Sequence, residues 1–193
     1  MSTQNIRLCV FLGNPGRQYR DTRHNAGYLL AAYHPDFSGE TWRTKFHADY
    51  LEVRSARSGV GYTAIRPTGF MNRSGVSVSE AATFFRISPE EMLVIHDDVE
   101  LPFGRIGFRR GGGMAGHKGL RDISTRTGSQ NYARLRIGIS RPQSGPVQAH
   151  VLGRFNSHEQ AALPELLEAA SELFDDVLAQ RVQTATDRTV FDF

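Results

Sequence analysis

The sequence predicts an α/β protein: a single-domain three-layer sandwich in which helices flank a mixed, mostly parallel β-sheet. Short apolar segments typical of buried strands alternate along the chain with segments of helical periodicity. No internal repeat or low-complexity linker divides the 193 residues, so we expect residues 1–193 to form one domain. No apolar run of membrane-spanning length occurs, and Met1–Asn5 are polar, so we expect a cytoplasmic protein without a secretory signal.

The chain is predicted to begin with a buried strand that ends in a turn. Arg7–Leu12 is mostly apolar, and a Gly-Asn-Pro-Gly sequence closes it with turn-forming residues. A modest helix is expected at Ala26–Tyr33. Ala48–Val53 and Val60–Ile65 are strand-like and lie on either side of a Ser-Gly pair, which predicts a hairpin.

The middle of the chain alternates between helix and strand signals. Ser74–Phe85 has apolar residues at helical spacing, which predicts a helix. Ser88–Glu91 combines an N-cap serine, a proline and a glutamate three residues after the cap, so it should open a helical turn. Met92–His96 and Arg105–Arg109 are predicted strands, and a helix is expected at His117–Thr127 after a glycine-rich loop.

A last strand and the longest helix are predicted in the C-terminal third. Leu135–Ile139 has the apolar character of a buried strand. Ser157 with Gln160 matches a capping box, so a helix is expected to begin there. Its apolar stripe consists of Leu163, Leu166, Leu167, Ala170, Phe174, Val177 and Leu178.

Polar residues gather in three places where predicted strands end: residues 14–25, 71–72 and 96–98. Ligand sites in open α/β sheets lie at this edge. His24 is a candidate general base near neutral pH, and Asp97 is a candidate for the acceptor that fixes its tautomer. Asn14 and Asn72 carry neutral amides, which bind polar substrates or a developing oxyanion. Each residue also has a purely structural interpretation, as a turn former, a helix-entry residue or a loop cap.

The glycine-rich loop resembles two phosphate motifs but satisfies neither. Gly111, Gly113 and Gly116 have the G-x-G-x-x-G spacing, yet no acid follows about 20 residues later, as a dinucleotide site requires. Lys118 is displaced by one position from the lysine of a P-loop and is followed by glycine. We therefore expect the backbone of this loop to approach a ligand closely, with Arg109 and Arg110 beside it.

Charge and cysteine content narrow the function classes. Lys45 and Lys118 are the only lysines among 23 basic residues, and the net charge of +3 is compatible with an anionic partner. Cys9 is the single cysteine, which excludes an internal disulfide and a cysteine-based metal site. No G-x-S-x-G or H-E-x-x-H motif occurs, and the histidine and aspartate spacings match no common metal site, so no metal is expected.

Several unusual strings occur in a characteristic order and spacing. They are Gly13-Asn14-Pro15-Gly16, Tyr19, Thr22-Arg23-His24-Asn25-Ala26-Gly27, Pro67-Thr68, Phe70-Met71-Asn72, Ser74-Gly75, Phe84 to Asp97, Leu101-Pro102, the Gly111–Gly119 loop and Leu135–Ile139. Together they resemble the motifs of bacterial-type peptidyl-tRNA hydrolases over nearly the whole chain. The resemblance implies a monomeric cytosolic enzyme that cleaves the ester between a stalled peptide and the terminal ribose of tRNA, without metal or cofactor.

The same resemblance implies roles for individual residues. His24 is expected to activate water as a base, and Asp97 to orient His24. Asn14 and Asn72 are expected to hold the peptidyl group and stabilise the oxyanion. Further roles implied are cleft lining for Tyr19 and Met71, phosphate binding for Arg109 and Arg136, and a mobile lid for Arg141–His150.

Two departures from the family pattern lie in the glycine loop. Lys118 stands where the family typically has asparagine, so a substrate-facing amide is replaced by a cation. We expect Lys118 to contact substrate, either by binding tRNA phosphate or by lying close enough to His24 to lower its pKa. Met114-Ala115 replaces a histidine and a glycine. These changes bear on catalytic rate and tRNA handling rather than on the fold.

Two other functions remain as alternatives. A catalytically weakened tRNA- or RNA-binding relative would keep the cleft and the basic residues. The retention of both His24 and Asp97 argues against it, because a binding protein needs neither. A dinucleotide-dependent oxidoreductase would use the glycine loop, but the acidic ribose ligand is missing.

Overall fold

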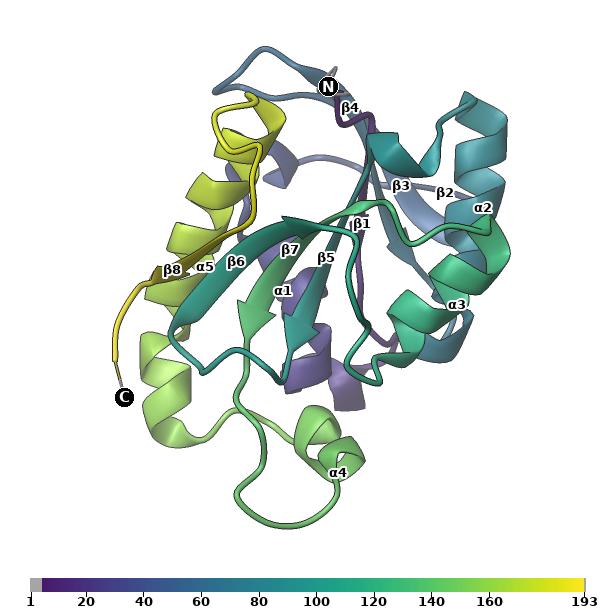
Figure 1. Ribbon diagram of the computed structural model, residues 1–193. Helices are drawn as coiled ribbons and strands as arrows, with labels where there is room; N and C mark the ends of the chain where they lie inside the picture. Colours follow the sequence, from purple (N-terminus) through teal and green to yellow (C-terminus); the bar gives the residue numbers. More distant parts are fainter. Residues whose placement is uncertain (1–4, 193) are drawn as a thin grey trace.

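A β-sheet forms the middle layer of the molecule, with helices on both of its faces (Figure 1). The computed structural model describes residues 5–192, and residues 1–4 of the polar start lie outside the described residues. Across the sheet, the eight strands within this range are β2 (Arg43–Lys45), β3 (Ala48–Arg54), β4 (Gly61–Pro67), β1 (Leu8–Phe11), β5 (Met92–Asp98), β7 (Ala133–Gly138), β6 (Arg105–Arg110) and β8 (Thr186–Thr189).

The sheet is mixed, with a parallel centre and antiparallel edges. β4, β1, β5 and β7 pair in parallel, whereas β2, β3, β6 and β8 join through antiparallel pairs. Among the described strands, three neighbouring pairs are parallel and four are antiparallel. The predicted mixed sheet is confirmed, but "mostly parallel" holds only for its centre. At the edge formed by β2, β3 and β4, short connections make the strands antiparallel: β3 and β4 form the predicted hairpin, and Phe46-His47 forms the turn between β2 and β3.

Helices cover both faces of the sheet. α1 (Ala26–Tyr33) and α5 (Ser157–Leu178) pack on one face, and α2 (Ser74–Phe85) and α3 (Lys118–Thr127) pack on the other. The short helix α4 (Val147–Leu152) lies beyond the ends of β5 and β7 (Figure 1). Within the part of the chain that the structure describes, no helix is long and apolar enough to cross a membrane.

Strand β1 shows how one sheet serves two hydrophobic cores. All four of its residues are fully buried, as its apolar sequence predicts. Cys9 and Phe11 belong to the core under α1 and α5, whereas Leu8 and Val10 belong to the core under α2 and α3. A central strand covered by helices on both faces needs apolar side chains at every position. Burial also raises the pKa of the Cys9 thiol.

Most predicted elements are confirmed, and α1 and α2 have the predicted bounds. The capping box that begins at Ser88 is present. The box predicted with Ser157 as cap is wrong by one residue, because Asn156 caps α5. Asn156 Oδ1 accepts from the Glu159 amide at 2.9 Å, and Glu159 Oε2 accepts from the Asn156 amide at 2.8 Å. Asparagine and serine make equivalent caps, so the sequence pattern alone does not decide the register.

Three elements carry little sequence signal. β2 and β8 are edge strands of three and four residues with largely exposed side chains, so they lack an apolar pattern. α4 has six residues, only one of them buried, and lies in the segment resembling a lid. Short exposed elements form because tertiary contacts with neighbouring elements position them. The hydrophobic periodicity of the sequence carries no signal of such contacts.

Candidate active site

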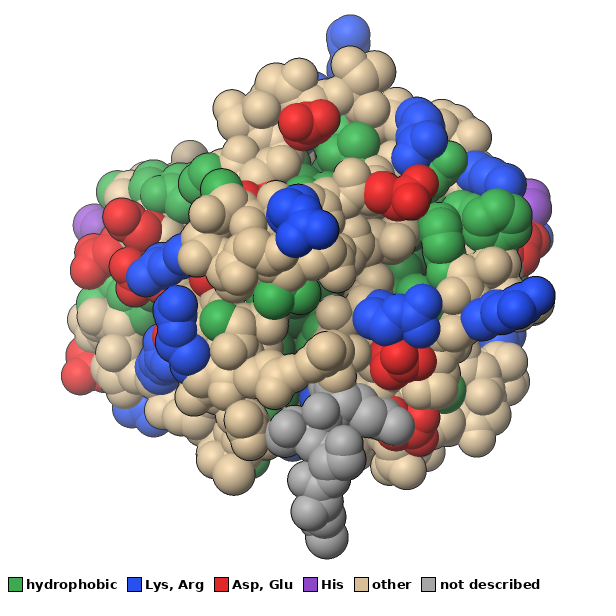
Figure 2. Space-filling model, turned by 90° about the horizontal axis from the view of Figure 1, so that it is seen from above, with side chains coloured by type: hydrophobic (Ala, Val, Ile, Leu, Met, Phe, Trp, Pro, Cys, Tyr) green, Lys and Arg blue, Asp and Glu red, His purple; other side chains and the backbone are tan. Residues whose placement is uncertain are grey.

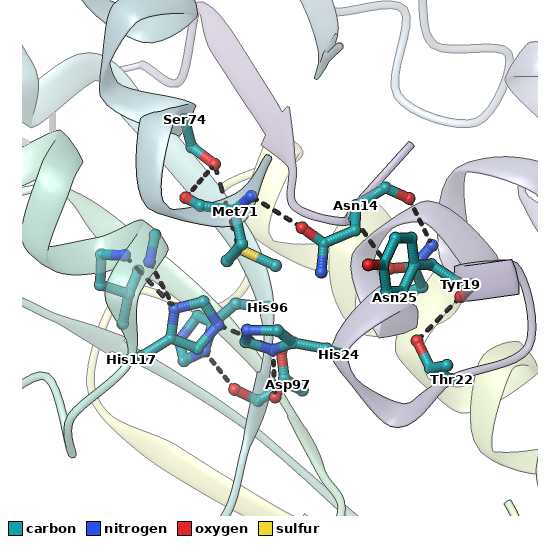
Figure 3. Close-up of polar contacts among 12 residues, drawn as sticks. Asn14, Tyr19, Thr22, His24, Asn25, Met71, Ser74, His96, Asp97 and His117 are labelled. Atoms are coloured by element: carbon teal, nitrogen blue, oxygen red, sulfur yellow. Dashed lines mark hydrogen bonds and ion pairs between the residues drawn. The ribbon is translucent and has the colours of Figure 1, made fainter. Parts of the chain in front are cut away.

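The carboxyl ends of the central strands open into a cleft of about 570 Å³. Asn14 follows β1, Met71 follows β4, and Asp97 lies near the end of β5. His24 comes from a helical turn directly before α1, and His117 comes from the glycine loop directly before α3 (Figure 3). Segments far apart in the sequence therefore deliver their polar side chains to one edge of the sheet.

Asp97 holds two imidazole rings at once. His24 Nδ1 lies 2.9 Å from Oδ1 and 3.0 Å from Oδ2 of Asp97, and His117 Nε2 lies 3.1 Å from Oδ1. The two rings contact each other, with centroids 4.9 Å apart. Asp97 is 2% exposed, so this contact is shielded from water. The structure thus brings together the predicted pair, His24 and Asp97, and adds His117.

Hydrogen bonds determine which ring nitrogens carry protons. The Asp97 carboxylate only accepts, so His24 Nδ1 and His117 Nε2 donate to it. His117 Nδ1 accepts from the backbone amides of Gly119 at 3.2 Å and Leu120 at 3.3 Å, and so caps α3. In neutral His24, the proton on Nδ1 leaves the lone pair on Nε2. That nitrogen is the basic one.

The electrostatics of the site keep Asp97 ionised and favour protonation of His24. Burial lowers the pKa of His24, but the Asp97 carboxylate outweighs it, and the net shift is upward despite the opposing charge of Lys118. Burial disfavours the Asp97 anion, yet the charges and hydrogen bonds of His24 and His117 hold the pKa of Asp97 far below its usual range. Burial above all lowers the pKa of neighbouring His96 to about 3, so that ring is neutral.

Asn14 is locked by three hydrogen bonds. Its backbone amide donates to Asn25 Oδ1 at 2.8 Å, and Asn25 Nδ2 donates to its carbonyl at 3.0 Å. Its own Oδ1 accepts from the Met71 amide at 2.8 Å. This last bond orients the side chain, so Asn14 Nδ2 is the group presented to the cleft (Figure 3). Asn14 is therefore a preorganised hydrogen-bond donor.

All five residues predicted to bind substrate border this one cleft: Asn14, Tyr19, Met71, Asn72 and Lys118. The Tyr19 ring packs edge-on against Phe70, with centroids 6.4 Å apart. Met71 is buried, whereas Asn72 and Lys118 are exposed. The cleft thus has aromatic and thioether surface together with polar groups that solvent and ligands reach.

The two arginines predicted to bind phosphate lie in different settings. Arg109 lines the cleft, and its Nη2 donates to the Gly113 carbonyl at 3.1 Å. Arg136 is buried and does not line the cleft. Its guanidinium donates to Asp98 at 2.7 Å and to Asp187 at 3.0 Å. The structure therefore does not bring Arg136 to the predicted site, because two carboxylates hold its guanidinium within the protein.

A third arginine, Arg134, supports the glycine loop from within the fold. It is fully buried, and its Nη1 and Nη2 donate to the carbonyls of Gly113 at 2.7 Å and Gly112 at 3.0 Å. Its guanidinium lies 4.9 Å from the centroid of the Tyr132 ring. The loop that carries His117 is thus attached to β7 through one side chain.

The segment expected to form a lid, 141–150, includes the first residues of α4, and Arg23 bonds to the chain that follows α4. Residues of α4 that line the cleft are Val147, Gln148, Val151 and Leu152. Arg23 Nη1 donates to the Arg154 carbonyl at 2.8 Å, and its Nη2 pairs with Glu159 at 2.6 Å. The residue next to the candidate base therefore holds the chain directly after the helix that lines the cleft.

His24, Asp97 and His117 also satisfy a geometric test for metal ligands, with ligand atoms within 4.8 Å of one another. The hydrogen bonds indicate that these side chains do not serve as metal ligands. Both ring nitrogens that face Asp97 carry protons, whereas a metal ligand needs an unprotonated nitrogen. The arrangement is therefore suited to acid–base chemistry.

Three residues complete the site without a strong sequence signal: His117, Asn25 and Arg134. A histidine between a glycine loop and a predicted helix is a possible N-cap, which is the one signal for His117. The Asn25 amide meets Asn14 only once the turn between them has folded. Arginine is usually exposed, so nothing in the sequence indicates that Arg134 is buried.

Residues 8–191 match the family model described as peptidyl-tRNA hydrolase. The chain belongs to the peptidyl-tRNA hydrolase family. Among its relatives, the peptidyl-tRNA hydrolase of Oleidesulfovibrio alaskensis is 43% identical over 175 residues, covering 86% of each chain. That of Neisseria meningitidis is 38% identical over 186 residues, covering 94% of this chain and 95% of the relative.

Solved structures of the peptidyl-tRNA hydrolase family have the same fold. The crystal structure of peptidyl-tRNA hydrolase from Acinetobacter baumannii matches with a TM-score of 0.77 and 38% identity, covering 94% of this chain and 92% of that chain. The family and α/β fold class inferred from the sequence are therefore confirmed, and so is the prediction that the chain is a hydrolase.

Proposed function

We propose that this protein hydrolyses the ester bond between a peptide and the 3′-terminal ribose of tRNA, with His24 as the base. The observation that carries the proposal is the 2.9 Å hydrogen bond from His24 Nδ1 to the buried Asp97 carboxylate. It leaves Nε2 of His24, a residue that lines the cleft, to accept a proton.

Water is the nucleophile in the proposed reaction. His24 Nε2 removes a proton as the water oxygen attacks the ester carbonyl carbon. Negative charge develops on the carbonyl oxygen, to which Asn14 Nδ2 donates a hydrogen bond. The bond to the ribose oxygen then breaks, and His24 returns the proton to that oxygen. Asp97 stabilises the transient imidazolium, and His117 keeps the carboxylate in position.

The remaining cleft residues bind the two parts of the substrate. Tyr19 and Met71 offer surface to the peptidyl group, and the Asn72 amide binds its polar backbone. Arg109 takes a phosphate at the tRNA end, since a guanidinium suits a phosphate. Lys118 lies in the same cleft, near the base. Arg136 does not contact the substrate in this proposal. It supports the site by donating a hydrogen bond to Asp98, which lines the cleft.

We further propose that the enzyme works as a monomer in the cytoplasm. The acceptor end of a tRNA is a cytoplasmic ligand, and the basic pI near 9.3 is compatible with it. Size-exclusion chromatography with light scattering should give the mass of a single chain.

The first test is His24→Ala with N-acetylaminoacyl-tRNA as substrate and no added metal. We expect kcat/KM to fall by about 100-fold or more, because general base catalysis contributes on that order. His158→Ala, an exposed histidine on α5, is the matched control and should match wild type. Near wild-type turnover in the His24 variant would contradict the mechanism. Salt-sensitive tRNA binding by wild type without cleavage would favour the RNA-binding alternative.

A further inference from the structure

The carboxylates that line the cleft are already paired. Among the described residues of its lining, the acids are Asp97 and Asp98. Asp97 accepts from two imidazole rings, and Asp98 accepts from Arg136 at 2.7 Å and from the Glu100 amide at 2.8 Å. Their exposed fractions are 2% and 4%. A ligand that enters this cleft therefore meets no carboxylate ready to neutralise a positive charge.

The charged side chain that a ligand does meet beside the base is a cation. Lys118 and Arg109 both line the cleft. Lys118 is exposed, whereas Arg109 is half-buried and its Nη2 donates to the Gly113 carbonyl. Lys118 is also the first residue of the ten-residue helix α3, whose N-terminal end carries a positive partial charge. The Lys118 ammonium is close enough to His24 to oppose the upward shift of its pKa. Lys118 therefore places an exposed positive charge beside the reacting ester.

The substrate's α-nitrogen has to enter this region. It is bonded to the carbon next to the ester carbonyl carbon, so it lies within two bonds of the atom that water attacks. An unblocked α-amino group is largely an ammonium at neutral pH. Burying an ammonium without a carboxylate partner is costly, and a nearby lysine adds repulsion. An N-acylated residue carries a neutral amide at the same place.

We propose that Lys118 is a specificity-determining residue that excludes acyl groups with a free α-ammonium, so that peptidyl-tRNA is cleaved and aminoacyl-tRNA is spared. The inference rests on the hydrolase function proposed above and identifies how its substrate class is selected. Selection works here by repelling the wrong substrate in addition to binding the right one. Solvent and salt screen part of the repulsion, so about tenfold discrimination is expected from this one charge.

The test compares three substrates on the same tRNA: an N-acetylaminoacyl ester, the free aminoacyl ester, and an α-hydroxyacyl ester. The hydroxyacyl ester has nearly the same size as the aminoacyl ester but no charge. Wild type should cleave it with a kcat/KM about tenfold above that of the aminoacyl ester. Lys118→Gln should remove most of this ratio, and Lys118→Glu should favour the aminoacyl ester further. Lys45→Gln removes the only other lysine, on edge strand β2, and should leave the ratio unchanged.

The outcomes separate this proposal from the function on which it rests. Equal cleavage of hydroxyacyl and aminoacyl esters by wild type would overturn the proposal, because charge would not decide the rejection. An unchanged ratio in Lys118→Gln would overturn it as well. Failure of wild type to cleave even the N-acetylated ester would instead overturn the hydrolase function. Lys118 is exposed, so matching thermal unfolding of its variants and wild type should show that any altered ratio is not a folding defect.

Discussion

At the scale of single residues, Asp97 organises the site. One buried carboxylate accepts from His24 and His117, and each donor has a second constraint that sets its orientation. His117 is held by the amides of α3, and His24 by the short turn that precedes α1. The carboxylate stays ionised at any physiological pH, because its neighbours keep its pKa far below the usual range. His24 is therefore the member of this group that is suited to exchange protons during a reaction.

The raised pKa of His24 has a consequence for the pH dependence of the reaction. A general base must be neutral, so activity should fall as the pH falls through a value above the ordinary 6.5. Lys118 opposes this shift, so Lys118→Gln should move the acidic limb of kcat/KM to higher pH. The measurement is a pH profile with the N-acetylated substrate at constant ionic strength. A limb that moves to lower pH in the variant would contradict the assignment of His24 as base.

At the scale of elements, the ion pair between Arg23 and Glu159 connects the turn that carries the base to the start of α5. The side chains are only 10% and 11% exposed, and Nη2 to Oε2 is 2.6 Å. Arg23 also donates to the Arg154 carbonyl, and its guanidinium lies over the Phe155 ring, 5.5 Å from the ring centroid. One buried side chain thus ties the segment after α4 to the active site.

Glu159→Gln should destabilise the fold by about 3 kcal/mol, because it leaves a buried guanidinium without its counter-charge. Glu52→Gln is the matched control, since its pair with Arg43 has a similar length of 2.8 Å but is largely exposed. That change should cost less than about 1 kcal/mol. Urea unfolding measures both free energies. Equal effects in the two variants would mean that burial of the Arg23 pair does not matter.

At the scale of the whole molecule, two cores share one sheet. Phe174 from α5 packs against Phe11, His34 and Tyr62 on one face, and Ile123 from α3 is buried on the other. Because the central strands contribute to both cores, loss of one face removes support from the other. The active site lies at the edge of this sheet and depends on both layers: His24 precedes α1, and His117 precedes α3.

Phe174→Ala and Ile123→Ala should therefore each destabilise the entire protein. Each should cost about 3 to 5 kcal/mol and still give one unfolding transition, because neither core is expected to melt alone. Phe84→Ala removes a ring that is 58% exposed and should cost much less. Urea unfolding followed by far-UV circular dichroism and by Trp42 fluorescence checks this. Two separated transitions would contradict one cooperative domain.

Local chemistry explains what the sequence determined by itself. The apolar run of β1, the spacing within α2 and the capping box at Ser88 depend on neighbouring residues, so these elements could be predicted. His24, Asp97 and Asn14 stood out because each has reactive or polar chemistry at a predicted strand end. The family resemblance added roles that residue types alone leave open.

Only the tertiary structure decided which of these residues meet. Asp97 reaches His24 because β1 and β5 are adjacent parallel strands, a pairing that joins residues more than 80 positions apart. The same long-range geometry makes His117 part of the site and pairs Arg136 with Asp98, so that Arg136 does not line the cleft. Periodicity and capping report interactions over a few residues. Convergence of side chains depends on strand order and register, which are determined by packing of the whole chain.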